Sequence, residues 1–175
     1  ILASQIVKLL AIFSPKMKLF VEGRKNVFKH LKEKIHPQDS TIWFHAASLG
    51  EFEQGLPIIE KMKVQFPSHK IVLTFFSPSG YEVRKNNTIA DVTVYLPLDT
   101  LSNATQFLNI VHPDRVFFIK YEYWPNYLLQ LKKRNIKTYL ISGIFRENQY
   151  FFRWYGSFYR KALESFTFFF VQNET

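Results

Sequence analysis

The chain has 175 residues, of which 47% are hydrophobic and 21% are charged. This length and composition suit one globular domain with a sizeable core and argue against an intrinsically disordered chain. The net charge of +9 points to an anionic partner, such as nucleic acid, phospholipid or a phosphorylated substrate, although a basic proteome background would give the same charge. The lack of cysteine excludes disulfides, thiolate catalysis and cysteine-ligated metal centres.

The first 37 residues have a sequence pattern of their own. Residues 1–13 are mostly apolar but fall short of the roughly 20 residues that span a bilayer. Seven basic and two acidic residues follow between Lys16 and Lys34. Apolar residues followed by lysines are typical of a membrane flank, so we expect residues 1–37 to lie at an anionic membrane surface. An amphipathic helix packed on the domain would give the same pattern. Since the chain opens on Ile1 and stops after an apolar run, we also expect a fragment of a longer protein.

From residue 38 onward, apolar strand-like runs alternate with helical patterns. Strands are expected at 41–47, 70–76, 91–98, 115–120, 137–144 and 167–172. Helices are expected at 50–66, after residue 80, and at 101–111, 124–134 and 147–164. Pro57 predicts a kink or a restart in the first of these helices. Near-continuous apolar strands are typical of a parallel sheet covered on both faces, so the sequence predicts a Rossmann-like, doubly wound α/β fold.

Polar residues follow the first expected strand, at the edge of the sheet where ligands bind in such folds. They are His45, Ser48, Gly50 and Glu51. Gly50 would allow a tight turn or the close approach of a ligand. Glu51 falls in the first turn of a helix, where a carboxylate is well positioned to take a proton from a hydroxyl group. The spacing of Ser48 and Glu51 also fits a capping box, and spacing alone favours the capping box.

The fourth and fifth expected strands lead to the same edge. Glu122 and Asn126 follow the fourth, where helix capping would also explain them, and Arg146 follows the fifth. Arg146, Arg153 and Arg160 recur every seven residues, which predicts one face of the last helix, beside many aromatic residues. A basic stripe next to rings suits a phosphorylated lipid, although most of these rings are expected to belong to the core.

Several kinds of site are absent from the sequence. It contains no GxGxxG, no P-loop and no GxSxG element, its four aspartates form no DxD pair, and its five histidines have no metal-ligand spacing. We therefore expect no cofactor and no metal. Nucleic acid is disfavoured as a partner because no recognised nucleic-acid module is present.

Six segments in order, HAASLGE, TFFSPSG, YLPLD, KYEYWPN, ISGIFR and FFFVQ, resemble the 3-deoxy-D-manno-octulosonic acid (Kdo) transferases. Each segment alone is weak, and the ordered set, which covers nearly the whole chain, is specific. The resemblance implies the GT-B architecture of two Rossmann-like domains. Residues 38–175 would be the N-terminal, acceptor-binding domain, and the C-terminal donor domain lies outside the chain. It also implies an N-terminal membrane anchor and a location at the cytoplasmic face of the inner membrane of a Gram-negative bacterium.

The resemblance further implies an activity, in which Kdo passes from CMP-Kdo to the lipid A precursor during lipopolysaccharide biosynthesis. The reaction would invert the anomeric configuration without a metal. Glu51 would be the general base, within a loop that includes Ser48 and Gly50.

Glu122 and Asn126 match the family's E-x-E-x-W-P-N segment, and Arg146 would bind the acceptor phosphate. One residue departs from the pattern, because Lys120 stands where the family has the first glutamate of that segment. Two alternatives stay open: a non-catalytic module that binds anionic lipid, and a GT-B enzyme with a different donor.

Overall fold

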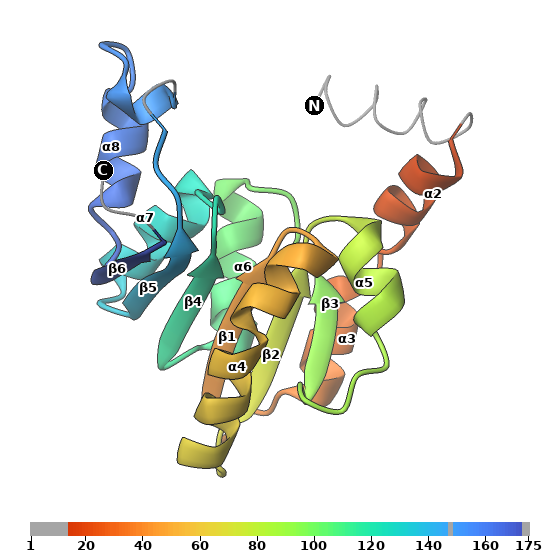
Figure 1. Ribbon diagram of the computed structural model, residues 1–175. Coiled ribbons are helices and arrows are strands. Elements are labelled where there is room, and N and C mark those ends of the chain that lie inside the picture. Colours follow the sequence, from red (N-terminus) through yellow and green to blue (C-terminus); the bar gives the residue numbers. More distant parts are fainter. Residues whose placement is uncertain (1–13, 147–148, 173–175) are drawn as a thin grey trace.

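The fold is a six-stranded parallel sheet with helices on both faces (Figure 1), as seen in a computed structural model that describes residues 14–146 and 149–172. The order of the strands across the sheet is β3-β2-β1-β4-β5-β6. They are β1 (Thr41–Ala46), β2 (Lys70–Phe75), β3 (Val92–Tyr95), β4 (Arg115–Ile119), β5 (Lys137–Gly143) and β6 (Phe168–Val171). The chain runs outward from β1 to β3 and then restarts on the other side of β1, which is the doubly wound order. The predicted Rossmann-like α/β fold is confirmed.

Helices cover the sheet in two layers. They are α2 (Pro15–Glu22), α3 (Val27–Lys34), α4 (Leu49–Gln65), α5 (Pro78–Arg84), α6 (Leu101–Val111), α7 (Pro125–Lys133), α8 (Ser157–Leu163) and a short 3-10 helix, η1 (Tyr150–Phe152). Helix α4 lies in front of the sheet in Figure 1 and buries Phe52 and Ile59 against it. Helices α3, α6 and α7 contribute to the core on the opposite face.

The centre of the sheet is buried on both sides because helices pack on both of its faces. All six residues of β1 are buried. The Trp43 ring packs 4.7 Å from the ring of Phe107 and 5.2 Å from that of Phe118, measured between centroids. Val27 and Leu31 of α3 join the same core, so the second half of the segment 1–37 is folded against the sheet.

Two expectations about helices differ from the structure. Helix α4 contains Pro57 and runs without a break to Gln65, so the helix does not restart at the proline. Buried residues on both sides of the proline, Phe52 and Ile59, hold it on the sheet.

The single helix expected at 147–164 is replaced by η1 and by α8, which begins after Gly156. The guanidinium of Arg160 donates to carbonyl oxygens in and after η1. The three arginines therefore share no helical face.

The expected burial of apolar residues also fails near the C-terminus. Strand β6 is the edge of the sheet, and its four apolar residues are between 42% and 58% exposed. The aromatic residues that were expected in the core are mostly exposed as well. This exposed aromatic patch consists of Phe152, Trp154, Tyr155, Phe158 and Tyr159. These residues lie beyond the sheet on η1, on α8 and on the turn between them, so the sheet offers them no cover.

Arg24 fastens α2 to the sheet. Its guanidinium donates to the carbonyl oxygens of Phe20 at 2.8 Å, Phe76 at 2.6 Å and Leu96 at 2.9 Å, and lies 3.7 Å from the centroid of the Phe20 ring. Burial lowers the pKa of Arg24 to about 10. Although Arg24 was counted in the basic flank, its charge is committed to the protein interior. The lysines of that segment remain available to a partner.

Replacing Arg24 tests this anchor. Arg24→Met leaves three carbonyl oxygens without their charged donor, so we expect the free energy of unfolding to fall by about 3 kcal/mol. The free energy of unfolding of Arg24→Lys should lie between those of the wild type and Arg24→Met, because an ammonium group cannot reproduce the planar fork of donors of a guanidinium. Chemical denaturation measures both, and Lys25→Met, at the exposed neighbour, is the control. Equal losses at positions 24 and 25 would refute the anchoring role.

Candidate active site

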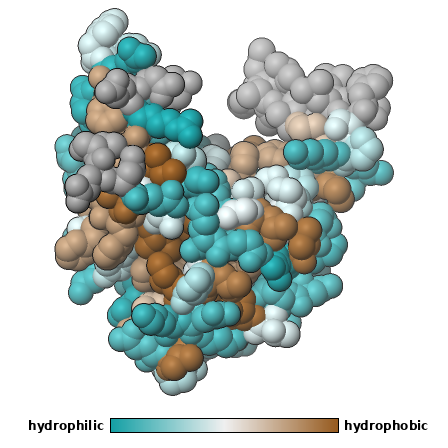
Figure 2. Space-filling model, viewed as in Figure 1, coloured by the Kyte–Doolittle hydropathy of each residue, from teal (hydrophilic) through white to brown (hydrophobic). Residues whose placement is uncertain are grey.

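The carboxyl ends of β1, β2 and β4 meet at one edge of the sheet. His45, near the end of β1, lies beside Thr74 of β2 and Phe118 of β4 in the register of the strands. The strand order reverses between β1 and β4, which is where doubly wound folds bind ligands. In Figure 1, α2 and α8 rise on opposite sides of this edge, and the surface in Figure 2 dips between them.

A buried polar network joins β1 and β2 to the loop after β4. His45 Nε2 lies 2.9 Å from Glu122 Oε2, and the indole N–H of Trp124 donates to the same oxygen at 2.6 Å. On its other side, His45 Nδ1 lies 2.8 Å from the hydroxyl oxygen of Thr74 and 3.1 Å from its carbonyl oxygen. His45 is fully buried and Glu122 is 7% exposed. These contacts therefore fix the positions of His45 and Glu122 at this edge of the sheet.

The partners of His45 limit how its ring can form hydrogen bonds. The Thr74 carbonyl oxygen can only accept, so a hydrogen bond at that contact has Nδ1 as its donor. The indole N–H of Trp124 lies 3.0 Å from Nε2 as well as 2.6 Å from Glu122 Oε2, so it can donate to either atom. No sequence pattern indicated Thr74, whose contact with His45 arises from the pairing of two strands.

Glu51 lies in the first turn of α4, near enough to Glu122 of this network to interact with its charge. Its carboxylate accepts the backbone N–H of Ala47 at 2.6 Å, which folds the side chain back over the loop after β1. Burial, and secondly the charge of Glu122, raises the pKa of Glu51 to about 7. The backbone donors and the charge of Lys120 oppose that rise. The carboxyl group therefore changes its charge near neutral pH.

The two explanations of the Ser48–Glu51 spacing can now be separated. Ser48 occupies the N-cap position but makes no side-chain capping bond, whereas Glu51 does reach back to the backbone. Only half of a capping box is formed. Gly50 lies within α4, has no positive φ, and a Cβ atom there would meet nothing within 4 Å. The tight-turn explanation of Gly50 is therefore wrong, and the open space above it suits the approach of a ligand.

The loop that carries Glu51 is held by the loop after β2. Ser77 donates its backbone N–H to the carbonyl oxygen of Ala47 at 2.7 Å. A Cβ atom on Gly80 would lie 2.3 Å from the ring of Phe75 and 3.1 Å from the backbone nitrogen of Leu49. Gly80 is needed for this close approach, and sequence analysis did not identify it as such.

Asn126 lies at the start of α7, where its side chain is already engaged. The carboxylate of Asp99 accepts the backbone N–H groups of Asn126 and Tyr127 at 3.2 Å each. The side-chain amide of Asn126 donates to the carbonyl oxygen of Asp99 at 3.1 Å. Burial raises the pKa of Asp99. The cap of α7 is thus Asp99, which the sequence could not reveal because it comes from the loop after β3.

Arg146 and Lys120 flank one tyrosine at the same edge. The guanidinium of Arg146 donates to the hydroxyl oxygen of Tyr121 at 3.2 Å and lies 5.5 Å from the centroid of its ring. The Lys120 ammonium lies 5.4 Å from that centroid. Lys120 has a left-handed backbone, with φ of 73°, and its N–H donates to the carbonyl oxygen of Ile141 at 2.9 Å.

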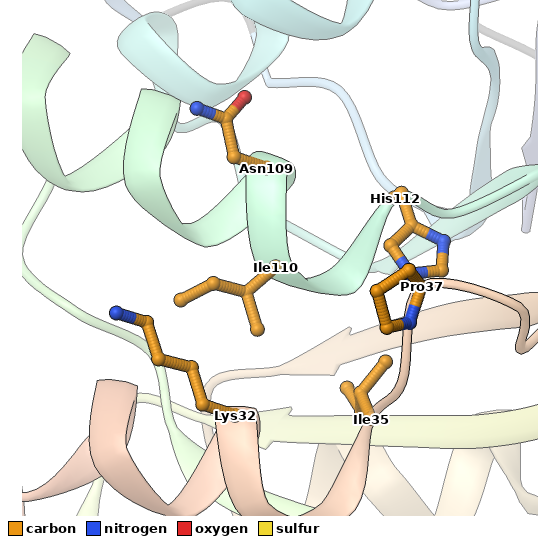
Figure 3. Close-up of a pocket in the computed structure, with 6 residues that line it drawn as sticks. All are labelled: Lys32, Ile35, Pro37, Asn109, Ile110 and His112. Carbon is orange, nitrogen blue, oxygen red and sulfur yellow. The ribbon is translucent and has the colours of Figure 1, made fainter.

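A cavity of about 360 Å³ lies far from these residues, between α3 and α6 (Figure 3). Lys32 and Ile35 line it on one side, and Asn109, Ile110 and His112 on the other. These residues are at the carboxyl ends of the two helices, whereas Glu51 is at the carboxyl edge of the strands. Within residues 14–146 and 149–172, no three side chains of the His, Asp or Glu type gather as metal ligands.

Comparison with known proteins agrees with this arrangement. The family described as 3-Deoxy-D-manno-octulosonic-acid transferase (kdotransferase) matches residues 12–175. The Kdo transferase of Haemophilus influenzae is 36% identical over 102 residues, which cover 57% of this chain and 24% of that protein. The Kdo transferase of Chlamydia muridarum is 30% identical over 131 residues, which cover 74% of this chain and 30% of that protein.

A solved structure has a similar fold. It is the Listeria monocytogenes protein described as a UDP-N-acetylglucosamine 2-epimerase, with a TM-score of 0.53 and 9% identity over 76% of this chain and 39% of that one. Such low identity supports the fold alone. The family match, in contrast, extends through all three loops that form the site. The chain belongs to the Kdo transferase family, and the matched part spans under a third of the length of these relatives.

Proposed function

We propose that this chain is the acceptor-binding, N-terminal domain of a GT-B enzyme that transfers Kdo from CMP-Kdo to the lipid A precursor in lipopolysaccharide biosynthesis. The observation that carries the proposal is Glu51, a carboxyl group with a pKa of about 7 at the carboxyl edge of the sheet. A general base is most effective when it titrates near the working pH. Membership of the Kdo transferase family supports Kdo as the transferred sugar. We propose that a second domain holds the donor.

In the proposed reaction, the Glu51 carboxylate takes the proton from an acceptor hydroxyl group. The hydroxyl oxygen then attacks the anomeric carbon of Kdo from the face opposite CMP. The bond to CMP breaks and its electron pair leaves with the phosphate, so the configuration inverts. We propose that no metal and no cofactor take part, which the lack of a DxD pair supports.

The remaining site residues have supporting roles in this proposal. Ser48 and Gly50 shape the acceptor loop, and the exposed surface of Gly50 leaves room for the sugar. Glu122 orients His45 at the end of β1. Asn126 acts through the start of α7, because its amide is engaged by Asp99. Arg146 contacts the phosphate of the acceptor.

We further propose that the domain works at an anionic membrane surface, on the cytoplasmic face of the inner membrane of a Gram-negative bacterium. Two features support this proposal: the lysines of the segment from Lys16 to Lys34, and the exposed aromatic patch, in which Trp154 is 90% exposed. Rings and lysines are the side chains that bind a lipid interface. None of the helices in the described part of the chain is long and apolar enough to cross a bilayer, and residues 1–13 lie outside that part.

The first of three predictions from this proposal concerns the charge of Glu51. Its pKa is about 7 in the folded protein and near 4.5 when unfolded, so the folded state retains a proton that the unfolded state has lost between these pH values. The stability of the wild type should therefore fall as the pH rises from 4.5 to 7 and then level off. The Glu51→Gln variant lacks this titration. Its free energy of unfolding, compared with that of the wild type, should therefore increase between pH 5 and pH 8. Chemical denaturation across that range measures the difference. Ser48→Ala, which keeps the carboxyl group, should follow the wild type, and a constant difference for Glu51→Gln would contradict the raised pKa.

The second prediction concerns catalysis. In a protein of the relatives' length that carries this chain, Glu51→Gln should lower the turnover of CMP-Kdo and lipid A precursor by at least about a hundredfold, since proton abstraction is lost. The wild-type rate should rise with pH and reach a plateau above about 7. Glu53→Gln, on the same helix, is the control. If Glu51→Gln kept most of the turnover with its fold intact, the half capping box would be the residue's whole role.

The third prediction concerns the membrane. Trp154→Ala combined with Phe158→Ala should weaken binding to phosphatidylglycerol vesicles at least about fivefold, because two exposed rings lose their apolar contact. Binding of the wild type should weaken with added salt. Co-sedimentation measures both effects. Val64→Ala, at an exposed apolar residue on α4, should bind as the wild type does, and binding indifferent to salt and to the rings would rule out this surface.

A further inference from the structure

Lys120 and Arg146 bring two positive charges to one tyrosine, beside the proposed base. Both cationic groups lie within 5.5 Å of the centroid of the Tyr121 ring. Neither forms an ion pair with a carboxylate among the residues that the structure describes. Two like charges near one ring repel each other. The Tyr121 ring and hydroxyl group and, for Lys120, the charge of Glu51 offset part of this repulsion, while both cations keep the capacity to bind an external anion.

We propose that Lys120, together with Arg146 and the Tyr121 hydroxyl group, forms a subsite for a phosphate or carboxylate group of the substrate, directly beside Glu51. This inference rests on the proposed function for the identity of the substrate, while the anion site itself is independent of it. The Arg146 guanidinium supplies a planar fork of donors and Lys120 supplies a point charge, which is a common pairing around such oxyanions.

The backbone of Lys120 supports a functional role. Its φ of 73° lies in the left-handed region, which costs free energy for any residue with a Cβ atom. The bond from its N–H to the carbonyl of Ile141 fixes this conformation between the ends of β4 and β5. Strained residues of this kind gather at ligand sites. A glycine would adopt the same backbone without strain, so the lysine side chain has another use.

The position relative to Glu51 gives the subsite a second effect. The charge of Lys120 lowers the pKa of Glu51, against the larger effects of burial and Glu122. An anion bound to Lys120 would cancel that influence and make the Glu51 carboxylate a stronger base. Substrate binding and proton abstraction would then be coupled through one side chain, and an empty site would hold a weaker base.

The anion site can be tested without any transfer reaction. We would titrate the 175-residue chain with inorganic phosphate at constant ionic strength and follow backbone amide resonances of residues 120–121 and 142–146 by NMR. Saturable shifts are expected in the wild type. Lys120→Gln and Arg146→Gln should each weaken binding about tenfold, the effect of losing one charge-assisted contact. Lys120→Arg should retain binding, and Lys133→Gln, at an exposed lysine on α7, should equal the wild type.

Kinetics of the longer protein then identify which substrate supplies the anion. If Lys120→Gln raises the KM for the lipid acceptor, and the effect disappears with an acceptor that lacks its phosphate, the group is the acceptor phosphate. If it raises the KM for CMP-Kdo instead, the group is the carboxylate or phosphate of the donor. In both cases the acidic limb of the pH–rate profile of Lys120→Gln should lie at higher pH than that of the wild type. The reason is that the pKa of Glu51 rises when the neighbouring cation is lost.

The outcomes are distinct for the two proposals. Phosphate binding that depends on Lys120, in a protein that transfers no Kdo, would refute the proposed function and leave the anion site intact. Phosphate shifts that are the same in Lys120→Gln, Arg146→Gln and the wild type would overturn the subsite, whatever the transferase assay gives.

Discussion

The contact between His45 Nε2 and Glu122 Oε2 joins the two strands on either side of the point where the strand order reverses. The rings around it have little freedom, because Thr74 holds one side of the imidazole and Trp124 holds the carboxylate. Breaking this contact would leave the buried carboxylate with one hydrogen-bond partner fewer, which is costly. Strand β1 and the loop after β4 are therefore fixed relative to each other before any ligand binds.

Glu51 depends on these fixed elements in two ways. The carboxylate is oriented by the backbone N–H of Ala47, whose own carbonyl is held by Ser77. Its charge is governed by burial first, by Glu122 second, and by Lys120 in the opposite direction. A carboxyl group that titrates near 7 results from this balance, in which the two opposing charges, Glu122 and Lys120, both come from the loop after β4. The contacts that stabilise the fold thus also determine the orientation and the pKa of Glu51.

Helix α2, at the periphery of the domain, is connected to the His45–Glu122 contact through a row of aromatic rings. The ring of Phe20 on α2 packs 5.2 Å from that of Phe76, which packs 4.7 Å from the ring of Trp124. Arg24 binds the carbonyl oxygens of Phe20 and Phe76 and so keeps α2 on this path. Helix α2 is thus linked through the ring of Phe76 to Trp124, which donates to Glu122.

The amino-acid pattern alone was enough to predict the architecture and the edge at which the site lies. Apolar runs with the period of strands and helices are local signals, and for this reason the alternation, the parallel sheet and helix α6 were predicted correctly. The ordered segments also identified the family. Three features became visible only in the folded domain: the charges of Glu122 and Lys120 near Glu51, the cap that Asp99 forms on α7, and the burial of Arg24. These depend on residues that are distant in the sequence, and spacing along the chain carries no record of them. The last helix was mispredicted for the same reason, since Arg160 binds backbone carbonyls that helical periodicity would have used.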